Sequence, residues 1–129
     1  MPLELNNARL DDVPCIIDLS YFSFSFQISY LSTLKESRYT ILESTVEEGY
    51  TRQLLEYDSH GDKVRAFLLL PETLGKNPAI LINHQHNREH HLGKSEVCGL
   101  AGNTWQAFGP KLAKKGFVVL APDSICFED

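Results

Sequence analysis

The sequence predicts an α/β fold, and three features of the chain support this prediction. Two strand-like runs, residues 51–59 and 63–72, flank a turn signal at His60-Gly61-Asp62 and indicate a hairpin. Two short runs of continuous apolar residues follow at 78–83 and 117–123, with helical signals between them. The order hairpin, strand, helix, strand is typical of an α/β sheet with an antiparallel edge and a right-handed crossover.

Composition and charge limit the classes of function. The chain has 129 residues, the size of one ordinary domain, and its hydrophobic share of 43% is typical of a globular protein. Acidic residues outnumber basic ones by 17 to 12, for a net charge of -5. Binding to nucleic acid or to an anionic membrane needs clustered basic residues, so we expect neither partner. The cluster Lys111, Lys114 and Lys115 suits the last turn of a helix instead.

The N-terminus and the cysteines favour a cytoplasmic protein. Residues 1–12 lack the basic start and apolar run of a secretory signal, and polar residues interrupt the apolar stretch 13–34. We therefore expect no signal and no membrane span. Cys15, Cys98 and Cys126 are odd in number and far apart, which argues against a disulfide framework or a zinc ribbon.

Residues 1–48 are interpreted as an N-terminal segment, a lid or packing extension, that precedes a partial domain at 49–129. Asp11 and Asp12 stand before an apolar run with a proline in its first turn, which is typical of a helix start. Apolar residues, aromatic except for Ile28, then alternate with polar ones over 22–30. This period of two favours a half-buried strand, and a helical interpretation stays open.

The apolar run at 78–83 predicts a strand of a parallel sheet that is covered on both faces, because its hydrophobic residues are continuous rather than alternating. The residues from His84 to Gly102 show little apolar periodicity. They predict a long loop, and loops of this length inside a compact domain are often functional.

The helix after this loop has two interpretations. Either Asn103 and Thr104 cap a helix that kinks at Pro110, or the regular helix begins near Gly109. In both cases Gly116 ends the helix. The side chains expected to face the sheet are those of Trp105, Phe108 and Leu112.

Residues 78–87, 91–96 and 112–123 together resemble the α/β-hydrolase superfamily, most closely its dienelactone hydrolase and bacterial esterase branch. In that fold a buried third strand ends in a His-Gly-type motif, a helix crosses over, and the fourth strand begins with Gly-aromatic and ends with Pro-Asp. The matching residues of the fourth strand are Gly116, Phe117, Val119, Pro122 and Asp123. The resemblance covers residues 50–129 and implies the N-terminal part of a hydrolase sheet.

The resemblance also implies a division of roles. A serine, or in dienelactone hydrolases a cysteine, attacks an ester carbonyl, a histidine takes its proton, and an acid orients the histidine. The loop after the third strand donates a backbone N–H to the oxyanion. Here that loop runs from His84 to Asn87, two residues that are also candidates to line the site. The implied donor is the N–H of Gln85 or His86, and Gln85 replaces the family's glycine.

The nucleophile turn is missing from the sequence. No G-x-S-x-G or G-x-C-x-G occurs, and the stretch 93–97 lacks the closing glycine. In family order the nucleophile follows the fifth strand, and the acid and the histidine come later still. The resemblance thus implies a chain truncated after the fourth strand, with every catalytic residue beyond Asp129. Without a fifth strand, 79–83 becomes an exposed apolar edge through which we expect self-association.

Four clustered histidines raise the question of a metal site. His84, His86, His90 and His91 carry imidazoles, which are good zinc ligands, but their spacing matches no known zinc pattern. We interpret them as loop residues that face solvent or substrate, with a metal-binding loop as the alternative. No cofactor is expected.

Asp123 and Cys126 lie near the end of the last predicted strand, where active-site loops gather, and are candidates to line the site. Asp123 is predicted to end the strand and cap the next turn rather than to serve as a triad acid. Cys126 is predicted to be a small buried filler, because nothing near it in sequence would lower its pKa.

Two classes of function remain. The first is the N-terminal part of a hydrolase that acts on a small-molecule carboxylic ester or lactone, with the oxyanion loop but without the nucleophile. Such a piece would be inactive alone. The second is a truncated, non-catalytic chain that binds or self-associates through its open edge.

Overall fold

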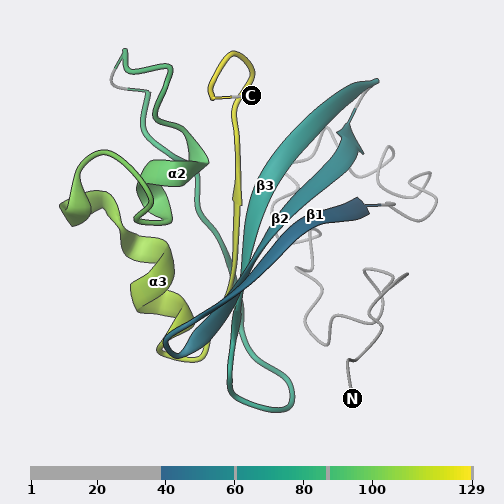
Figure 1. Ribbon diagram of the computed structural model, residues 1–129, viewed down its shortest axis with the longest axis vertical. Helices are drawn as coiled ribbons and strands as arrows, with labels where there is room; N and C mark the ends of the chain where they lie inside the picture. Colours follow the sequence, from purple (N-terminus) through teal and green to yellow (C-terminus); the bar gives the residue numbers. More distant parts are fainter. Residues whose placement is uncertain (1–38, 60, 87, 129) are drawn as a thin grey trace, which may run out of the picture.

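The computed structural model describes residues 39–59, 61–86 and 88–128, and these form one mixed sheet of five strands with short helices beside it (Figure 1). The strand order is β1-β2-β3-β5-β4, in which the first three pairs are antiparallel and the last is parallel. The predicted α/β character is therefore present. The strands are β1 (Tyr39–Glu47), β2 (Tyr50–Ser59), β3 (Asp62–Pro71), β4 (Ala79–Leu81) and β5 (Val118–Pro122).

The hairpin of β2 and β3 confirms the prediction made from 51–59 and 63–72. The two strands pair without a register shift as far as Ser59 and Asp62. At the turn Gly61 adopts a φ of 94°. Glycine reaches this left-handed conformation at no steric cost, so the local sequence alone specifies the hairpin.

No sequence pattern predicts β1, which pairs with the outer side of β2. Most of its residues are exposed, whereas Tyr39 and Ile41 pack on the apolar cluster of the sheet. The register shifts between Ile41 and Glu43. A bulge of this kind increases the twist of an edge strand. Pairing with β2 provides most of the stability of β1, so its side chains need not alternate between apolar and polar.

The sequence predictions for residues 1–38, the helix start and the alternating aromatic run, lie outside the described residues. The division made at residue 49 falls in the turn between β1 and β2. Pairing of Glu47 with Tyr50 carries the sheet across this turn.

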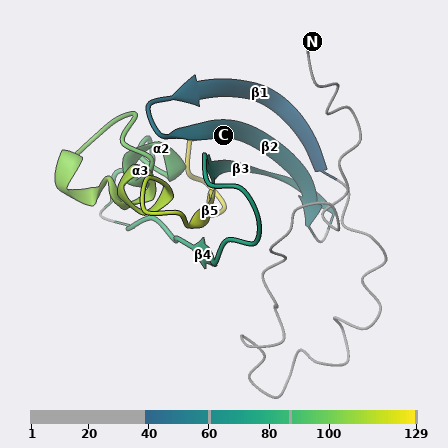
Figure 2. The same cartoon turned by 90° about the horizontal axis from the view of Figure 1, so that it is seen from below.

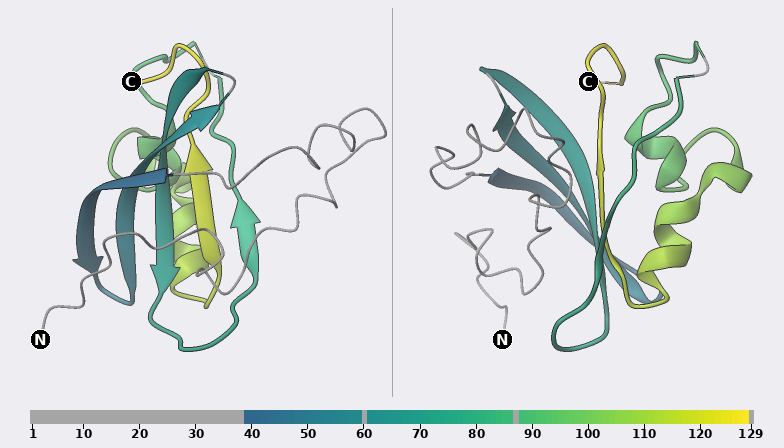
Figure 3. Two further views of the ribbon diagram at one scale, coloured as in Figure 1. Left: turned by 90° about the vertical axis from the view of Figure 1, so that its right-hand side faces the viewer. Right: turned by 180° about the vertical axis from the view of Figure 1, so that it is seen from behind.

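β4 lies at the end of the strand order and pairs with β5 (Figure 3). The parallel register runs from Ala79↔Val118 to Leu81↔Leu120. Within the described ranges no strand pairs with the other side of β4. This is the edge position expected for residues 79–83.

The crossover from β4 to β5 contains three short helical elements. These are α2 (Lys94–Val97), the 3₁₀ turn η3 (Thr104–Gln106) and α3 (Phe108–Ala113). The prediction of an uninterrupted loop from His84 to Gly102 is wrong at α2. A helix of four residues is too short to show periodicity, and its buried charged residues resemble loop residues in the sequence. Across the described parts of the chain, no helix is long and apolar enough to cross a membrane.

η3 and α3 decide between the two interpretations of the predicted helix. The Asn103 side chain accepts the N–H of Trp105 at 3.0 Å and caps η3. α3 is a separate helix that begins just before Gly109, with Pro110 in its first turn, where the missing N–H would have no partner anyway. Gly116 follows its last turn with a φ of 93°. The second interpretation is the one observed.

α2 and α3 pack on one face of the sheet, against β3 and β5 (Figure 2). Gly109 allows α3 to approach α2 closely, because a Cβ at this position would lie 2.9 Å from the carbonyl oxygen of Val97. A second cluster of Leu55, Leu68 and Val118 belongs to the other face, since side chains alternate along each strand. The core on the helical face comprises Tyr50, Phe67, Leu69, Val97, Cys98, Ala113, Val119 and Ala121.

The prediction that Trp105 and Phe108 face the sheet is wrong. They are 81% and 46% exposed. Residues three apart share a face only within one continuous helix, and the break at Ala107 between η3 and α3 removes that relation. Leu112, which belongs to α3 proper, packs on the core as predicted.

Candidate functional site

Two loops meet at one edge of the sheet, because β4 and β5 are parallel and both end there. The first loop runs from 82 to 93 and the second from 123 to 128. A backbone hydrogen bond of 2.9 Å from Glu128 N to His90 O joins them. Both loops lie at the upper end of β5 in Figure 1. Open α/β sheets bind ligands at this edge, so it is the candidate site.

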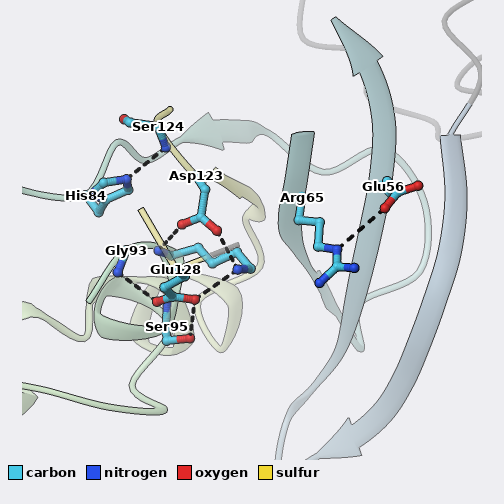
Figure 4. A network of polar contacts seen from close by, with 9 residues as sticks. Glu56, Arg65, His84, Gly93, Ser95, Asp123, Ser124 and Glu128 are labelled. Atoms are coloured by element: carbon cyan, nitrogen blue, oxygen red, sulfur yellow. Dashed lines mark hydrogen bonds and ion pairs between the residues drawn. The ribbon is translucent and has the colours of Figure 1, made fainter. Parts of the chain in front are cut away.

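His84 connects the two loops through its ring. Nε2 accepts the backbone N–H of Ser124 at 3.0 Å, and Nδ1 lies 2.9 Å from the carbonyl oxygen of Gln85 (Figure 4). Because a carbonyl oxygen can only accept, Nδ1 carries the proton and the ring is the neutral Nδ1–H tautomer. Both ring nitrogens are thus occupied in holding the loops together.

The side chain of Gln85 binds to α2. Its Nε2 donates to Glu96 Oε2 at 2.8 Å, and Glu96 Oε1 accepts the N–H of Asn103 at 3.0 Å. Glu96 is 1% exposed, so these bonds compensate the loss of its hydration. Gly102 leaves room for the carboxylate, since a Cβ there would lie 2.7 Å from Glu96 Oε1.

The backbone N–H groups of Gln85 and His86 have no hydrogen-bond acceptor within the part of the chain that the structure describes. Both belong to the stretch in which the family resemblance implies an oxyanion donor. The Gln85 side chain, at the position where the resemblance implies a glycine, is held by Glu96. Asn87, another candidate of this stretch, lies outside the described residues.

Three histidines of the first loop surround Phe127 of the second. The Phe127 ring centroid lies 4.5 Å from that of His84, 5.5 Å from that of His86 and 4.8 Å from that of His90. Phe127 is buried, whereas His86, His90 and His91 are exposed. The described residues include no group of three or more His, Cys, Asp or Glu side chains that could hold a metal ion. The geometry therefore lends no support to the metal-binding alternative.

Lys94, Asp123 and Glu128 form a buried ion cluster, here called the Lys94 cluster, that joins α2 to the second loop (Figure 4). Lys94 Nζ binds Asp123 Oδ2 and lies 2.9 Å from Glu128 Oε2. The side chains of Lys94, Asp123 and Glu128 are 3%, 5% and 13% exposed. The ammonium also lies 5.6 Å from the Phe67 ring centroid, within cation–π range.

The two carboxylates of the cluster also accept backbone hydrogen bonds. Asp123 Oδ1 accepts the N–H of Lys94 at 2.7 Å. Glu128 Oε1 accepts the N–H groups of Gly93 at 2.7 Å and Ser95 at 2.9 Å, and Oε2 accepts the Ser95 hydroxyl at 2.8 Å. No buried side-chain nitrogen or oxygen of the described residues lacks a partner. The buried polar atoms of the cluster therefore all have partners, and one ammonium is shared by two carboxylates.

The two carboxylates differ in acidity although they share one ammonium. Burial raises the pKa of Asp123 above its ordinary value, against the lowering effect of Lys94. Burial acts in the same direction on Glu128, but the hydrogen bonds from Lys94, Ser95 and Gly93 outweigh it and hold its pKa below the ordinary value. The difference follows from the larger number of donors around Glu128.

Gly93 is the residue that lets Asp123 approach α2. A Cβ at this position would overlap the Asp123 carboxylate. In the sequence the stretch 93–97 resembles only an incomplete nucleophile motif, and the roles of Lys94, Ser95 and Glu128 are not predicted. No local sequence signal indicates these residues, because Asp123 and Glu128 lie 29 and 34 residues beyond Lys94.

The second loop contains two predicted site residues, and a prediction about each is wrong: the capping role of Asp123 and the burial of Cys126. Asp123 directly follows β5, but its carboxylate binds Lys94 instead of capping the next turn. Cys126 is exposed rather than buried. Cys126 has a φ of 70°, and a hydrogen bond of 3.1 Å from Phe127 N to Ser124 O closes the turn around it. In this turn the Phe127 ring is buried instead of the Cys126 side chain.

No protein-family model matches the chain, and no curated protein matches it. The structure is similar to the crystal structure of a Bacteroides fragilis protein described as a putative acetyl xylan esterase, with a TM-score of 0.53 and 18% sequence identity. The chain shares its fold with part of that protein. The likeness covers 78% of this chain and 29% of that chain.

At 18% identity the likeness concerns the fold alone. It is consistent with the hydrolase fold that residues 78–87 and 112–123 imply. The chain spans 29% of the length of the Bacteroides protein.

Proposed function

We propose that this chain forms the oxyanion-loop part of a serine or cysteine hydrolase that acts on carboxylic esters or lactones. The observation that carries the proposal is a pair of backbone N–H groups, those of Gln85 and His86, at the carboxyl edge of β4. Neither has an acceptor among the described residues. The fold shared with a protein described as an esterase supports it.

In the proposed reaction a nucleophile attacks the ester carbonyl and negative charge develops on the carbonyl oxygen. The N–H of Gln85 or His86 stabilises this charge, together with the N–H that follows the nucleophile. The reaction needs no cofactor.

Three described residues that could serve as the other catalytic groups are engaged in other contacts. His84 uses both ring nitrogens, Asp123 binds Lys94, and the Ser95 hydroxyl donates to Glu128. The sequence contains no nucleophile turn. In the proposal the nucleophile follows a later strand of the sheet, and the acid and the catalytic histidine follow the nucleophile.

Covalent labelling tests the proposed chemistry. A fluorophosphonate probe and an iodoacetamide probe are applied to the 129-residue chain and to the product of its intact natural coding sequence. We expect labelling of a nucleophile turn in the longer product only, unchanged by Ser95→Ala. Labelling of the 129-residue chain that Ser95→Ala abolishes, or a longer product without a reactive turn, would contradict the proposal.

Proline substitution tests the two backbone donors, because proline lacks the N–H. In the longer product, loss of the true donor lowers kcat for p-nitrophenyl acetate by roughly 10²–10³-fold. His86→Pro is compared with His86→Ala, which keeps the N–H, and Gln85→Pro is compared with Gln85→Gly. If neither proline variant loses more activity than its control, this loop is not the oxyanion donor.

A second candidate function is self-association of the chain through β4. The observation that favours it is the position of β4, which pairs with β5 on one side and with no other described strand (Figure 3). Ile82 N bonds to Leu120 O and Val118 N bonds to Pro78 O, so the N–H of Leu81 points away from β5. An apolar strand with unpaired donors is a template for a second copy.

Sedimentation velocity tests this candidate. The wild-type chain should form dimers or larger species, and Leu81→Pro, which removes an outward N–H, should shift it towards monomer. Leu81→Ala keeps the N–H and should associate as the wild type does. A wild-type chain that is folded and monomeric at high concentration rules out this candidate.

A further inference from the structure

We infer that Lys94 is a positioning residue: its buried ammonium locks the loop after β4 onto the loop after β5 and thereby sets the tautomer of His84 and the place of the oxyanion loop. The consequence for catalysis rests on the proposed function. The coupling of the two loops is independent of the proposed function, because every contact that carries the coupling lies within the described residues.

The Lys94 cluster connects elements that are distant in sequence. Lys94 opens α2, whereas its partners Asp123 and Glu128 lie 29 and 34 residues further on. Three groups of the chain segment 93–95 donate to the same Glu128 carboxylate besides the ammonium. The Lys94 side chain is 3% exposed, and its partners accept several further hydrogen bonds from the same segment. It therefore cannot exchange partners without opening both loops.

The first step of the coupling runs through Asp123. Its carboxylate is held by the backbone N–H and the ammonium of Lys94, and its own N–H donates to Arg65 O on β3 at 3.0 Å. The peptide that follows is thereby fixed. Its N–H, that of Ser124, is the donor to His84 Nε2, and Figure 4 shows the ring facing it.

The second step runs through Glu128. Its carboxylate is fixed to the start of α2, and its backbone N–H donates to His90 O at 2.9 Å. Phe127, one residue earlier, is 4% exposed and lies against the rings of His84 and His90. The Lys94 cluster therefore holds the second loop at both ends, at Asp123 and at Glu128. The first loop packs on Phe127, which lies between them.

This arrangement fits a positioning role better than a purely stabilising one. Replacing a buried ion cluster by apolar side chains is often neutral or favourable for stability, because the desolvation penalty disappears. The ionised carboxylates here fix a geometry, because each hydrogen bond has a defined direction. Glu128 accepts four hydrogen bonds and Asp123 accepts two, all from residues 93–95. The ordered result is a His84 ring with one proton position.

Nuclear magnetic resonance of the ¹⁵N-labelled chain tests the inference without any ester chemistry. Two-bond correlations of the imidazoles report the tautomer of His84, and amide exchange reports the protection of Ser124. In Lys94→Met, under conditions where circular dichroism shows a folded sheet, we expect loss of the pure Nδ1–H signature. Exchange of the Ser124 amide should be at least about tenfold faster.

Lys114→Met is the matched control, since Lys114 forms an exposed ion pair with Glu48 at 3.1 Å. It should leave the signals of His84 and Ser124 unchanged. A folded Lys94→Met variant in which both signals are also unchanged would overturn the inference and reduce Lys94 to a structural residue.

A measurement on the wild-type chain covers the case in which Lys94→Met does not fold. If the cluster couples the loops, the amides of Lys94 and Ser124 open together and exchange with similar opening free energies. Protection factors that differ by more than about tenfold would overturn the inference. If covalent labelling fails while the nuclear magnetic resonance and exchange results are as expected, the hydrolase proposal is rejected and the coupling of the loops is retained.

Discussion

Two lysine ion pairs of nearly equal length lie in contrasting regions of the molecule. On the β2–β3 hairpin, Lys63 Nζ lies 2.8 Å from Asp58, and the side chains are 62% and 68% exposed. At the carboxyl edge of the sheet, Lys94 Nζ lies 2.9 Å from Glu128, and the side chains are 3% and 13% exposed. Distance alone therefore does not distinguish the pairs; their environment does.

Access to water determines how much each ion pair contributes to the stability of the fold. Around the hairpin pair, solvent screens the charges and offers each of them another partner, so loss of the contact costs little. Around Lys94 no solvent replaces a lost partner, and removing one member leaves an uncompensated charge in an apolar setting. The buried pair is therefore tied to one arrangement of the loops, whereas the exposed pair is not tied to any.

The largest expected effect comes from removing the two ammonium groups in turn. Lys94→Met should lower the free energy of unfolding by about 3–5 kcal/mol, because Asp123 and Glu128 are left buried without their partner. Lys63→Met should leave the urea midpoint unchanged within error. Urea unfolding followed by circular dichroism gives both values, and equal losses for the two variants would remove the distinction between the pairs.

A steric change at Gly93 probes the same cluster without removing a charge. In Gly93→Ala the new methyl group overlaps the Asp123 carboxylate, and we expect a loss of about 1–3 kcal/mol, the usual cost of overpacking. In an Asp123→Ser background the same substitution should cost less. Thermal unfolding of the four proteins of this cycle measures the coupling; strictly additive losses would show that Gly93 and Asp123 do not meet.

Acid titration separates the two carboxylates of the cluster. The pKa of Glu128 is lowered in the folded state, so its contribution is complete above its ordinary value of 4.5 and is lost as the pH falls through the lower folded value. The pKa of Asp123 is raised, so it takes up a proton earlier in the folded state and acidification relieves a cost.

Stability measured against pH should therefore fall less steeply below pH 4.5 in Glu128→Gln than in the wild type. In Asp123→Asn it should fall more steeply. Urea midpoints taken at closely spaced pH values give the slopes. Identical slopes in both variants would show that the two carboxylates have the same acidity.

The smallest effect is expected at Trp105, which is 81% exposed on η3. Trp105→Phe should leave the unfolding midpoint unchanged, because no buried area is lost. The fluorescence of the wild-type indole should have the red-shifted maximum of a solvent-exposed side chain. Emission typical of a buried indole would instead place Trp105 in an interface.

The two regions also differ in how far the sequence predicts them. The hairpin follows from neighbouring residues: strand-forming runs separated by Gly61, each specified within a few positions. β5 likewise follows from its continuous apolar run and its closing Pro122. β1 escapes prediction because its exposed residues have no pattern of their own and its stability depends on pairing with β2.

The candidate site shows the opposite behaviour. The stretch from His84 is identifiable through its resemblance to a hydrolase loop, yet nothing in the sequence indicates that Lys94 is buried. Its partners Asp123 and Glu128 are 29 and 34 residues away, and no periodicity relates positions so far apart. Cys126 is mispredicted for a related reason, since the turn conformation that exposes it depends on the burial of Phe127.

The sequence by itself determined the hairpin, the two apolar strands, the glycine-terminated helix and the likeness to an α/β hydrolase. These depend on local backbone preferences and on hydrophobic patterns within short windows. Only the tertiary structure decided that the N–H groups of Gln85 and His86 lack acceptors among the described residues. It also decided that Lys94 joins the two loops. Burial and charge pairing depend on which distant segments meet, and that is settled by packing rather than by any short stretch of sequence.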